Sequence, residues 1–161
     1  MRLRFSIKQP VATNCINIDP FPQNVNDEKV SITNIQNYEY ISSFVHDSQC
    51  TEILLDKCLN YIPFKKIVDF LSFVSSKLRK NGKLIIINDD LNSVISMYES
   101  GKIDCFDLNQ LLFGEQSSAT DFKSSSLSLV DMVTLLEDIQ NLKVIKRQFS
   151  NHQFIVEATK S

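Results

Sequence analysis

The sequence is poor in glycine, the residue that most tight phosphate-binding turns require. Only three of its 161 residues are glycine, namely Gly82, Gly101 and Gly114, and they lie far apart. Neither a GxGxxG turn nor a Walker-type lysine loop is therefore present. These absences argue against the usual nucleotide sites that cradle a phosphate in a glycine-rich backbone turn.

The cysteines form no pattern typical of metal binding. Cys15, Cys50, Cys58 and Cys105 contain no CxxC pair, and neither histidine is close to a cysteine pair in sequence. This spacing predicts that no zinc ion or other metal is bound. Free thiols are typical of a cytoplasmic protein, and we expect that location.

The chain also lacks a surplus of positive charge and a long hydrophobic run. Its net charge is −2, whereas binding along nucleic-acid phosphates needs a surplus of Lys and Arg, so general nucleic-acid binding is not expected. The longest aliphatic run, at residues 84–87, is far shorter than the roughly 18 residues of a membrane span. With 43% hydrophobic and 22% charged residues, we expect one globular domain over residues 1–161 and no contact with a membrane.

In the first third of the chain, alternating apolar residues predict short strands. Leu3, Phe5 and Ile7 lie on one side of a first strand, and residues 15–19 form a second. Val30 and Ile32 indicate a weaker third strand. Residues 34–45 are expected to contain a short helix.

The middle of the chain has the clearest patterns. Residues 52–56 (EILLD) predict a strand, and apolar residues at three- and four-residue spacing predict a helix over residues 64–78. Basic residues at 77, 79 and 80 suit the last turn of that helix, and Gly82 is expected to cap it. The run KLIIIN at residues 83–88 is typical of a central strand covered on both faces.

The last part predicts helices and then a hairpin. Helices are expected at residues 91–100, 107–113 and 127–140, and strands at 142–149 and 152–158 flank a turn at Ser150 and Asn151. The order of elements predicts an α/β fold: a Rossmann-like, mostly parallel sheet flanked by helices, with an antiparallel C-terminal hairpin.

Several polar and aromatic residues have both a structural and a functional interpretation. Asn88, Asp89 and Asp90 could hold a metal or act as a base, but Asp89 and Asp90 precede a helix, and capping of its N–H groups is favoured. His46 and His152 have no matched Ser, Cys or Asp, which argues against a catalytic triad.

Apolar surroundings give a structural interpretation to two further groups of residues. Cys58 lies in an apolar stretch and is expected to be a buried thiol rather than a nucleophile. Tyr38, Tyr40 and Phe44 could form an aromatic wall for a substrate, although packing in the core is favoured.

Four segments, taken in order, resemble class I S-adenosylmethionine-dependent methyltransferases, especially the small variants called type 11-like. The opening RLRFSIKQPVATNCINIDPFP resembles that family's first strand, cofactor loop and second strand, including its Asn-Ile-Asp ending at residues 17–19. Residues 52–90 resemble the fourth strand, the following helix and the fifth strand. Residues 97–116 resemble the helical insert, and the last forty residues resemble the closing helix and hairpin.

The resemblance implies an S-adenosylmethionine site and assigns positions to it. The turn after the first strand would contact the amino-acid end of the cofactor, an acid after the second strand its ribose, and a later residue its adenine. The residue after the fourth strand, at position 56 or 57, would face the substrate. The candidate cofactor-binding residues are Ser6, Lys8, Asp19, Asn34 and Asp56. No catalytic residue is indicated.

Several positions depart from the family pattern. Ser6 and Lys8 stand where the family has glycines, and a lysine side chain there would project into the cofactor's space. The family's L-E-H triplet reads Cys-Leu-Asn at residues 58–60, and Thr51 replaces an aspartate. Asp19 can bind ribose or simply end a strand, and Lys8 can pair with the cofactor's carboxylate or lie in solvent.

Two functions remain open. The first is a methyltransferase with an altered cofactor loop that acts on an unknown methyl acceptor; it predicts an open pocket at the carboxyl ends of the first and fourth strands. The second is a non-catalytic scaffold that binds a partner or forms a homodimer. It predicts that Ile7, Lys8 and Val11 fill the pocket.

Overall fold

The structure is a computed structural model that describes residues 1–6, 13–18, 41–117 and 121–161. The weak strand predicted at Val30 and Ile32 lies outside these residues, as does most of the helix predicted at residues 34–45. Of that helix, residues 41–45 are described, and residues 41–43 form a 3-10 turn.

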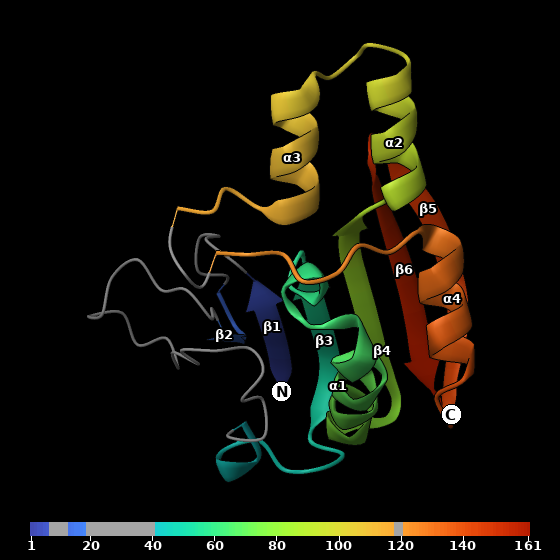
Figure 1. The fold of residues 1–161 in the computed structure, drawn as a ribbon. Helices are drawn as coiled ribbons and strands as arrows, with labels where there is room; N and C mark the ends of the chain where they lie inside the picture. The colour runs from blue at the N-terminus through green and yellow to red at the C-terminus, as the bar shows by residue number, and fades with distance from the viewer. Residues whose placement is uncertain (7–12, 19–40, 118–120) are drawn as a thin grey trace.

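A six-stranded mixed sheet, with strand order β2-β1-β3-β4-β6-β5, forms the centre of the molecule (Figure 1). β1, β2, β3 and β4 run parallel, whereas β6 is antiparallel to β4 and β5 is antiparallel to β6. The strands are β1 (Arg2–Ser6), β2 (Ile16–Ile18), β3 (Cys50–Asp56), β4 (Leu78–Asp89), β5 (Leu142–Ser150) and β6 (Gln153–Lys160). The predicted α/β fold, with a mostly parallel sheet and an antiparallel C-terminal hairpin, is confirmed.

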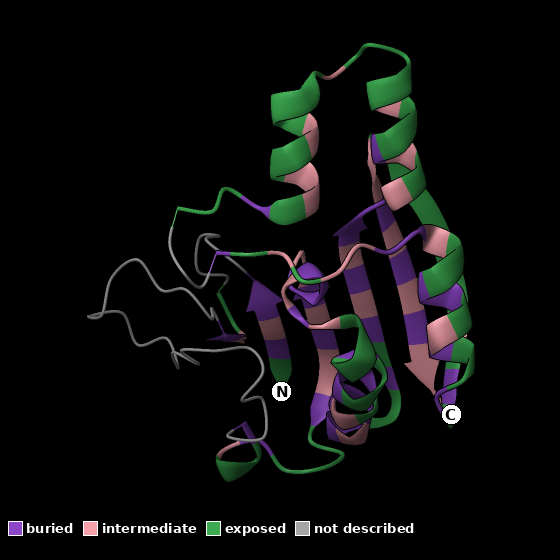
Figure 2. Ribbon diagram, viewed as in Figure 1, coloured by how far each residue is buried: buried purple, intermediate pink, exposed green. Residues whose placement is uncertain are grey.

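Two helices cover one face of the sheet, and two others rise above its edge (Figure 1). The helical segments are η2 (Leu59–Tyr61), α1 (Phe64–Lys77), α2 (Leu91–Glu99), α3 (Cys105–Phe113) and α4 (Leu129–Glu137). α1 and α4 lie against the sheet and bury their apolar sides there, whereas α3 has no buried residue (Figure 2).

The core lies between the sheet and α1 and α4, because alternate strand residues point to that face. Phe5 of β1 and Phe70 of α1 are fully buried and meet edge to face, with ring centroids 5.5 Å apart at 85°. Burying a side chain of this size contributes about 1.5–3 kcal/mol. Phe44 packs against the same core, as expected, whereas Tyr38 and Tyr40 lie outside the described residues.

The connection from α1 to β4 differs from the prediction. α1 ends at Lys77, and Gly82 lies within β4 instead of capping the helix, so that assignment was wrong. The ammonium of Lys160 donates to the carbonyl oxygens of Ser75 and Leu78, each at 2.8 Å, and so satisfies groups that a glycine cap would otherwise serve. A Cβ at Gly82 would lie 2.8 Å from the backbone oxygen of Arg79.

The predicted C-terminal elements are present with small changes at their ends. The turn of the hairpin falls at residues 151–152, and Asn151 adopts φ 56, a conformation that asparagine tolerates in tight turns. α4 begins after Ser128, which forms a reciprocal capping box with Asp131. Leu127 precedes the helix and forms a parallel bridge with Asp90 instead.

β1 is an interior strand, hydrogen-bonded to β2 on one side and to β3 on the other. The strand order therefore reverses at β1, with β2 on one side of it and β3 on the other. The carboxyl ends of β1 and β3 flank the crevice where α/β proteins bind ligands. None of the helices in the described part of the chain combines the length and the apolar character that crossing a membrane would require.

Candidate functional site

The carboxyl ends of β1 and β3 bring together two of the candidate cofactor-binding residues. Ser6 ends β1 and is paired in register with Asp56, which ends β3. Ser6 is buried. The other three candidates, Lys8, Asp19 and Asn34, lie outside the described residues and stay predictions.

Asp56 is held by an arginine from the neighbouring strand. The guanidinium Nη2 of Arg4 lies 2.9 Å from Oδ2 of Asp56, and both side chains are only 15% exposed. Such charge-assisted hydrogen bonds are short and strong. The charge of the Asp56 carboxylate is therefore compensated within the sheet.

Asp89 ends β4 and accepts hydrogen bonds from groups on two other segments. Its carboxylate receives the ammonium of Lys123 at 3.1 Å and the amide of Gln153 at 3.2 Å, and Nε2 of His152 lies 3.4 Å away. The expectation that Asp89 caps a helix was therefore wrong. Groups from the hairpin and from the segment after α3 thus surround this carboxylate and use its hydrogen-bond acceptors.

Asp90 has the capping role that the sequence predicts. Its Oδ2 accepts from the backbone N–H of Ser93 at 2.8 Å, which caps α2. Its Oδ1 accepts from the N–H of Leu129 at 2.8 Å, which the sequence did not predict. One buried carboxylate thus joins the starts of α2 and α4.

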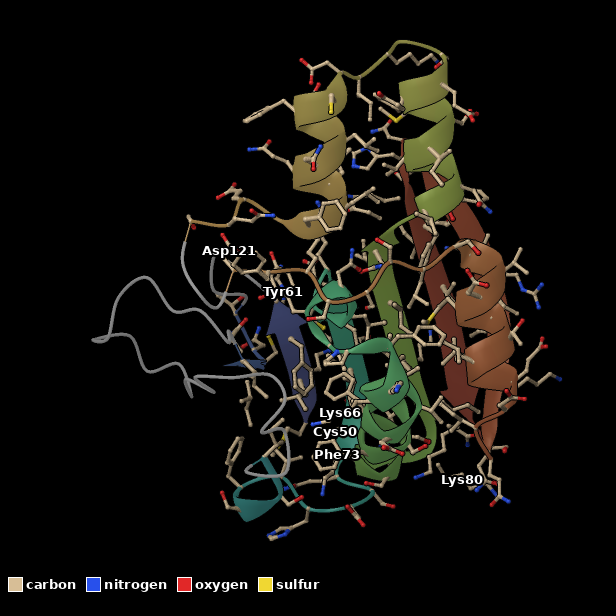
Figure 3. All side chains as sticks on the ribbon, in the orientation of Figure 1. Cys50, Tyr61, Lys66, Phe73, Lys80 and Asp121 are labelled. Atoms are coloured by element: carbon tan, nitrogen blue, oxygen red, sulfur yellow. The ribbon has the colours of Figure 1, made fainter. Side chains whose placement is uncertain are left out.

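Tyr61 and Asp121 form a second polar contact above the end of β3, where Figure 3 shows them side by side. The hydroxyl of Tyr61 donates to Oδ1 of Asp121 at 3.2 Å, and Oγ of Ser117 donates to Oδ2 at 2.7 Å. Burial raises the pKa of Tyr61 far above its usual value, and the nearby carboxylate of Asp121 raises it further. Tyr61 is therefore a neutral hydrogen-bond donor here.

A cavity of about 510 Å³ lies between these strand ends and α3. We call it the α3 cavity. Its lining residues are Lys57, Tyr61, Asp89, Met97, Ile103, Asp107, Gln110, Leu111, Gly114, Glu115, Asp121, Lys123 and His152. The inner face of α3 lines this cavity instead of packing on the core, which explains why that helix buries no residue.

A second hollow, of about 890 Å³, lies between α2, the start of α4 and the hairpin turn. Met97 and His152 line both hollows. The second one is bounded by exposed apolar side chains such as Val130 and Phe149. It is slightly more open to solvent than the α3 cavity.

Other candidates from the sequence are not part of this site. Cys58 is fully buried, as expected, and burial raises the pKa of its thiol well above the usual value. His46 is exposed and lies in the segment before β3. Among the described residues, no group of three or more His, Cys, Asp or Glu is placed to hold a metal ion.

Sequence reasoning missed most of the polar residues that line the α3 cavity. Tyr61 lies in the three-residue helix η2, and Asp121 and Lys123 lie in an irregular segment. Neither is long enough or regular enough for a periodic pattern to indicate where a side chain points. The contact between His152 and Asp89 could have been found from the sequence. The last strand follows the hairpin turn and pairs antiparallel with the most apolar strand, so the turn lies beside the end of that strand. The resemblance puts either residue 56 or residue 57 facing the substrate, and of the two Lys57 lines the cavity.

Comparison with known proteins gives similarity in structure but not in sequence. No protein-family model matches the chain, and no curated protein matches it at a significant level. Similar solved structures include 1,6-didemethyltoxoflavin-N1-methyltransferase of Burkholderia thailandensis, with a TM-score of 0.54 and 10% identity over 91% of this chain and 61% of that one. The CurJ carbon methyltransferase has a TM-score of 0.51 and 10% identity over 99% of this chain and 48% of that one.

A third similar structure is an S-adenosylmethionine-dependent methyltransferase of Thermotoga maritima, with a TM-score of 0.50 and 14% identity over 73% of this chain and 59% of that one. The chain thus spans less than two thirds of the length of each of these proteins. The similarity is to a mixed sheet in which β1 is an interior strand, β1 to β4 are parallel and the last two strands are antiparallel. The chain has the class I S-adenosylmethionine-dependent methyltransferase fold.

Proposed function

We propose that the chain is a methyltransferase-like binding protein that does not transfer the methyl group of S-adenosylmethionine. The ion pair between Arg4 and Asp56 carries this proposal. S-adenosylmethionine has a sulfonium cation and an ammonium group, which a free carboxylate at this strand end would stabilise. The Asp56 carboxylate is instead already compensated by a guanidinium 2.9 Å away.

The end of β1 supports the same conclusion. A cofactor that approaches the backbone closely needs glycine there, but the first glycine of the sequence is Gly82. Ser6 is buried at the end of β1 and stands where the family has a glycine. The described residues at this edge therefore fit S-adenosylmethionine poorly.

A second candidate function is methyl transfer from S-adenosylmethionine to an unknown acceptor. The α3 cavity favours it, because the cavity lies at the carboxyl ends of β3 and β4, beside the expected cofactor position. An acceptor held there would react mainly because it is correctly oriented. As a binding protein, the chain would instead act through a ligand in this cavity, through a partner or as a homodimer.

Titration calorimetry and thermal melting with S-adenosylmethionine and S-adenosylhomocysteine test the choice. We expect no heat of binding and no shift of the melting temperature. A ligand present at a hundred times its Kd would stabilise the protein by about 2.7 kcal/mol and raise the melting temperature by roughly 5–10 °C. Saturable binding of either compound would overturn the proposal and support the enzyme.

The variant Arg4→Met shows whether the ion pair causes the loss of binding. It removes the guanidinium and leaves the Asp56 carboxylate available. Binding of S-adenosylhomocysteine by this variant, but not by the unaltered protein, would assign the loss to Arg4 directly.

A further inference from the structure

We propose that the α3 cavity binds an uncharged molecule with an apolar body and a carbonyl oxygen, and that the ammonium of Lys57 donates to this oxygen. The proposal goes beyond the proposed function, because it names the chemistry of a ligand for this cavity and holds whether or not S-adenosylmethionine binds. It rests on a lysine without an acceptor, on the charges around it and on the apolar wall beside it.

Lys57 differs from the other lysines of the described chain that are buried or half-buried. Each of the others donates to an acceptor of the protein at 3.1 Å or less, namely Lys77, Lys123 and Lys160. Lys57 is half-buried and lines the α3 cavity, but within the described ranges its ammonium has no acceptor from the protein. Because burying a charged donor without a hydrogen bond is unfavourable, this ammonium is available to an acceptor that enters the cavity.

The backbone holds Lys57 at the edge of the cavity. Lys57 follows β3 directly and adopts φ 56, a left-handed conformation that residues with a Cβ take only at a cost. Its N–H donates to the carbonyl oxygen of Ile87 in β4 at 2.8 Å, so the turn stays attached to the neighbouring strand. Residues that their surroundings hold in such conformations are common at ligand sites. The sheet itself therefore sets the position of the lysine before any ligand arrives.

The carboxylates that line the cavity have interactions of their own and do not require a ligand. Asp89 accepts from Lys123, and Asp121 accepts from two hydroxyl groups. Asp107 belongs to the capping box of α3, and Glu115 also has interactions of its own. Lys57 is thus the charged group of this lining that lacks a partner among the described residues.

The charges around Lys57 favour an uncharged ligand. Four carboxylates line the cavity against two ammonium groups, so a ligand anion would be repelled by more charges than attract it. A ligand cation would be placed near Lys57 and would leave its ammonium without an acceptor. A carbonyl oxygen adds no charge, and a hydrogen bond that it accepts from an ammonium is stronger than one between neutral groups.

The apolar wall accommodates the body of the ligand. Met97, Ile103 and Leu111 line the cavity and are each half-buried, so a ligand would remove further apolar surface from water. The volume of about 510 Å³ lies in the range of small-molecule sites. Such sites combine an apolar lining with a few polar groups that orient the ligand, and Lys57 has that role here.

Titration of the isotopically labelled full chain, followed by NMR spectroscopy, tests the proposal with compounds that differ in charge. Benzylacetone and 3-phenylpropionamide carry an uncharged carbonyl group, 3-phenylpropionate is an anion and 3-phenylpropylamine is a cation. We expect the two carbonyl compounds to bind at least about tenfold more tightly than either charged compound. Absence of binding by both carbonyl compounds at millimolar concentration overturns the proposal, as does equal or tighter binding of a charged compound.

Two lysine variants test the role of Lys57. Lys57→Met removes the donor, whereas Lys102→Met makes the same change at an exposed lysine that lines only the second hollow. We expect Lys57→Met to weaken binding of benzylacetone at least about tenfold and to strengthen binding of 3-phenylpropylamine, because the cavity then has one positive charge fewer. Lys102→Met is expected to change neither. Unchanged binding of benzylacetone by Lys57→Met, or equal effects of the two variants, contradicts the assignment.

The conservative variant Lys57→Arg keeps a charged donor and is expected to retain binding of benzylacetone. Loss of binding in this variant, with a melting temperature like that of the parent protein, would show that hydrogen-bond donation at position 57 is not sufficient and would contradict the assignment.

The two proposals fail separately. Binding of S-adenosylhomocysteine contradicts the proposed function, and absence of a response to the carbonyl compounds contradicts the proposed ligand of the α3 cavity.

Discussion

Two ion pairs of similar burial lie at the same edge of the sheet, yet they do different things. Arg4 and Asp56 join two strands that already pair through their backbones. Lys123 and Asp89 join the irregular segment after α3 to the end of β4, with side chains 11% and 9% exposed. The first pair neutralises a carboxylate, and the second attaches a segment that has no regular structure of its own.

The surroundings of the two carboxylates explain this difference. Asp89 also receives the amide of Gln153 and lies beside His152, so its negative charge organises donors from two segments. Asp56 accepts its hydrogen bond from the guanidinium of Arg4, which lies on the neighbouring strand of the same sheet. Ion pairs of similar exposure can thus attach a segment to the sheet in one place and neutralise a strand-end carboxylate in another.

The substitution Asp89→Asn is expected to have the largest effect on stability. It removes the charge that compensates the buried ammonium of Lys123, and breaking a buried pair in this way costs about 3–5 kcal/mol. Urea unfolding followed by circular dichroism measures the loss, and Asp138→Asn, at an exposed position, is the control. A decrease of less than about 1 kcal/mol in the free energy of unfolding would mean that the ammonium of Lys123 becomes solvated when Asp89 is replaced.

The pair within the sheet is expected to be replaceable as a unit. Arg4→Met alone and Asp56→Leu alone each leave one charge unpaired and are expected to cost about 3 kcal/mol, whereas the double variant is expected to be close to neutral. The same urea measurement on all three variants gives the coupling energy. Additive losses in the double variant would show that the pair stabilises the sheet in its own right.

The smallest effect is expected at an exposed carboxylate, the capping residue Asp131. Hydrogen bonds from the side chain and then the backbone of Ser128 lower the pKa of Asp131 below its usual value. A lowered folded-state pKa adds stability above the unfolded value of about 3.9, and this stability is lost as pH falls through the lowered value. Asp131→Asn should therefore reduce stability slightly at pH 7 and no longer do so near pH 2.

Urea midpoints of both proteins at the two pH values measure the change. A difference that persists in acid would assign the effect of Asp131 to something other than its charge.

Apolar patterns in the sequence predicted the strands well, because burial on one or both faces leaves a period that can be read directly. β3 and β4 show this, and so does β6, whose buried residues alternate. The end of α1 was not predictable in the same way. The group that satisfies its last carbonyls is Lys160, which is more than eighty residues away in sequence.

The candidate site was predictable in place but not in chemistry. The resemblance put Asp56 and Lys57 at the correct strand end, because the carboxyl ends of parallel strands meet at one edge. The partner of Asp56 is Arg4, which has no marker in the sequence. The polar residues that line the α3 cavity come from several separate segments, such as Tyr61 from η2 and Asp121 from the irregular segment after α3, and only the three-dimensional arrangement brings them together.

The position of Gly82 has a consequence for how this sequence can vary. A Cβ there would lie 2.8 Å from the backbone oxygen of Arg79 and 3.1 Å from that of Cys50. Because both obstacles are main-chain atoms, no change of rotamer can make room. Homologues that keep this short link should therefore retain glycine at the position, and asparagine or glycine at position 81, where φ is 61, while the exposed residues 79 and 80 are free to diverge.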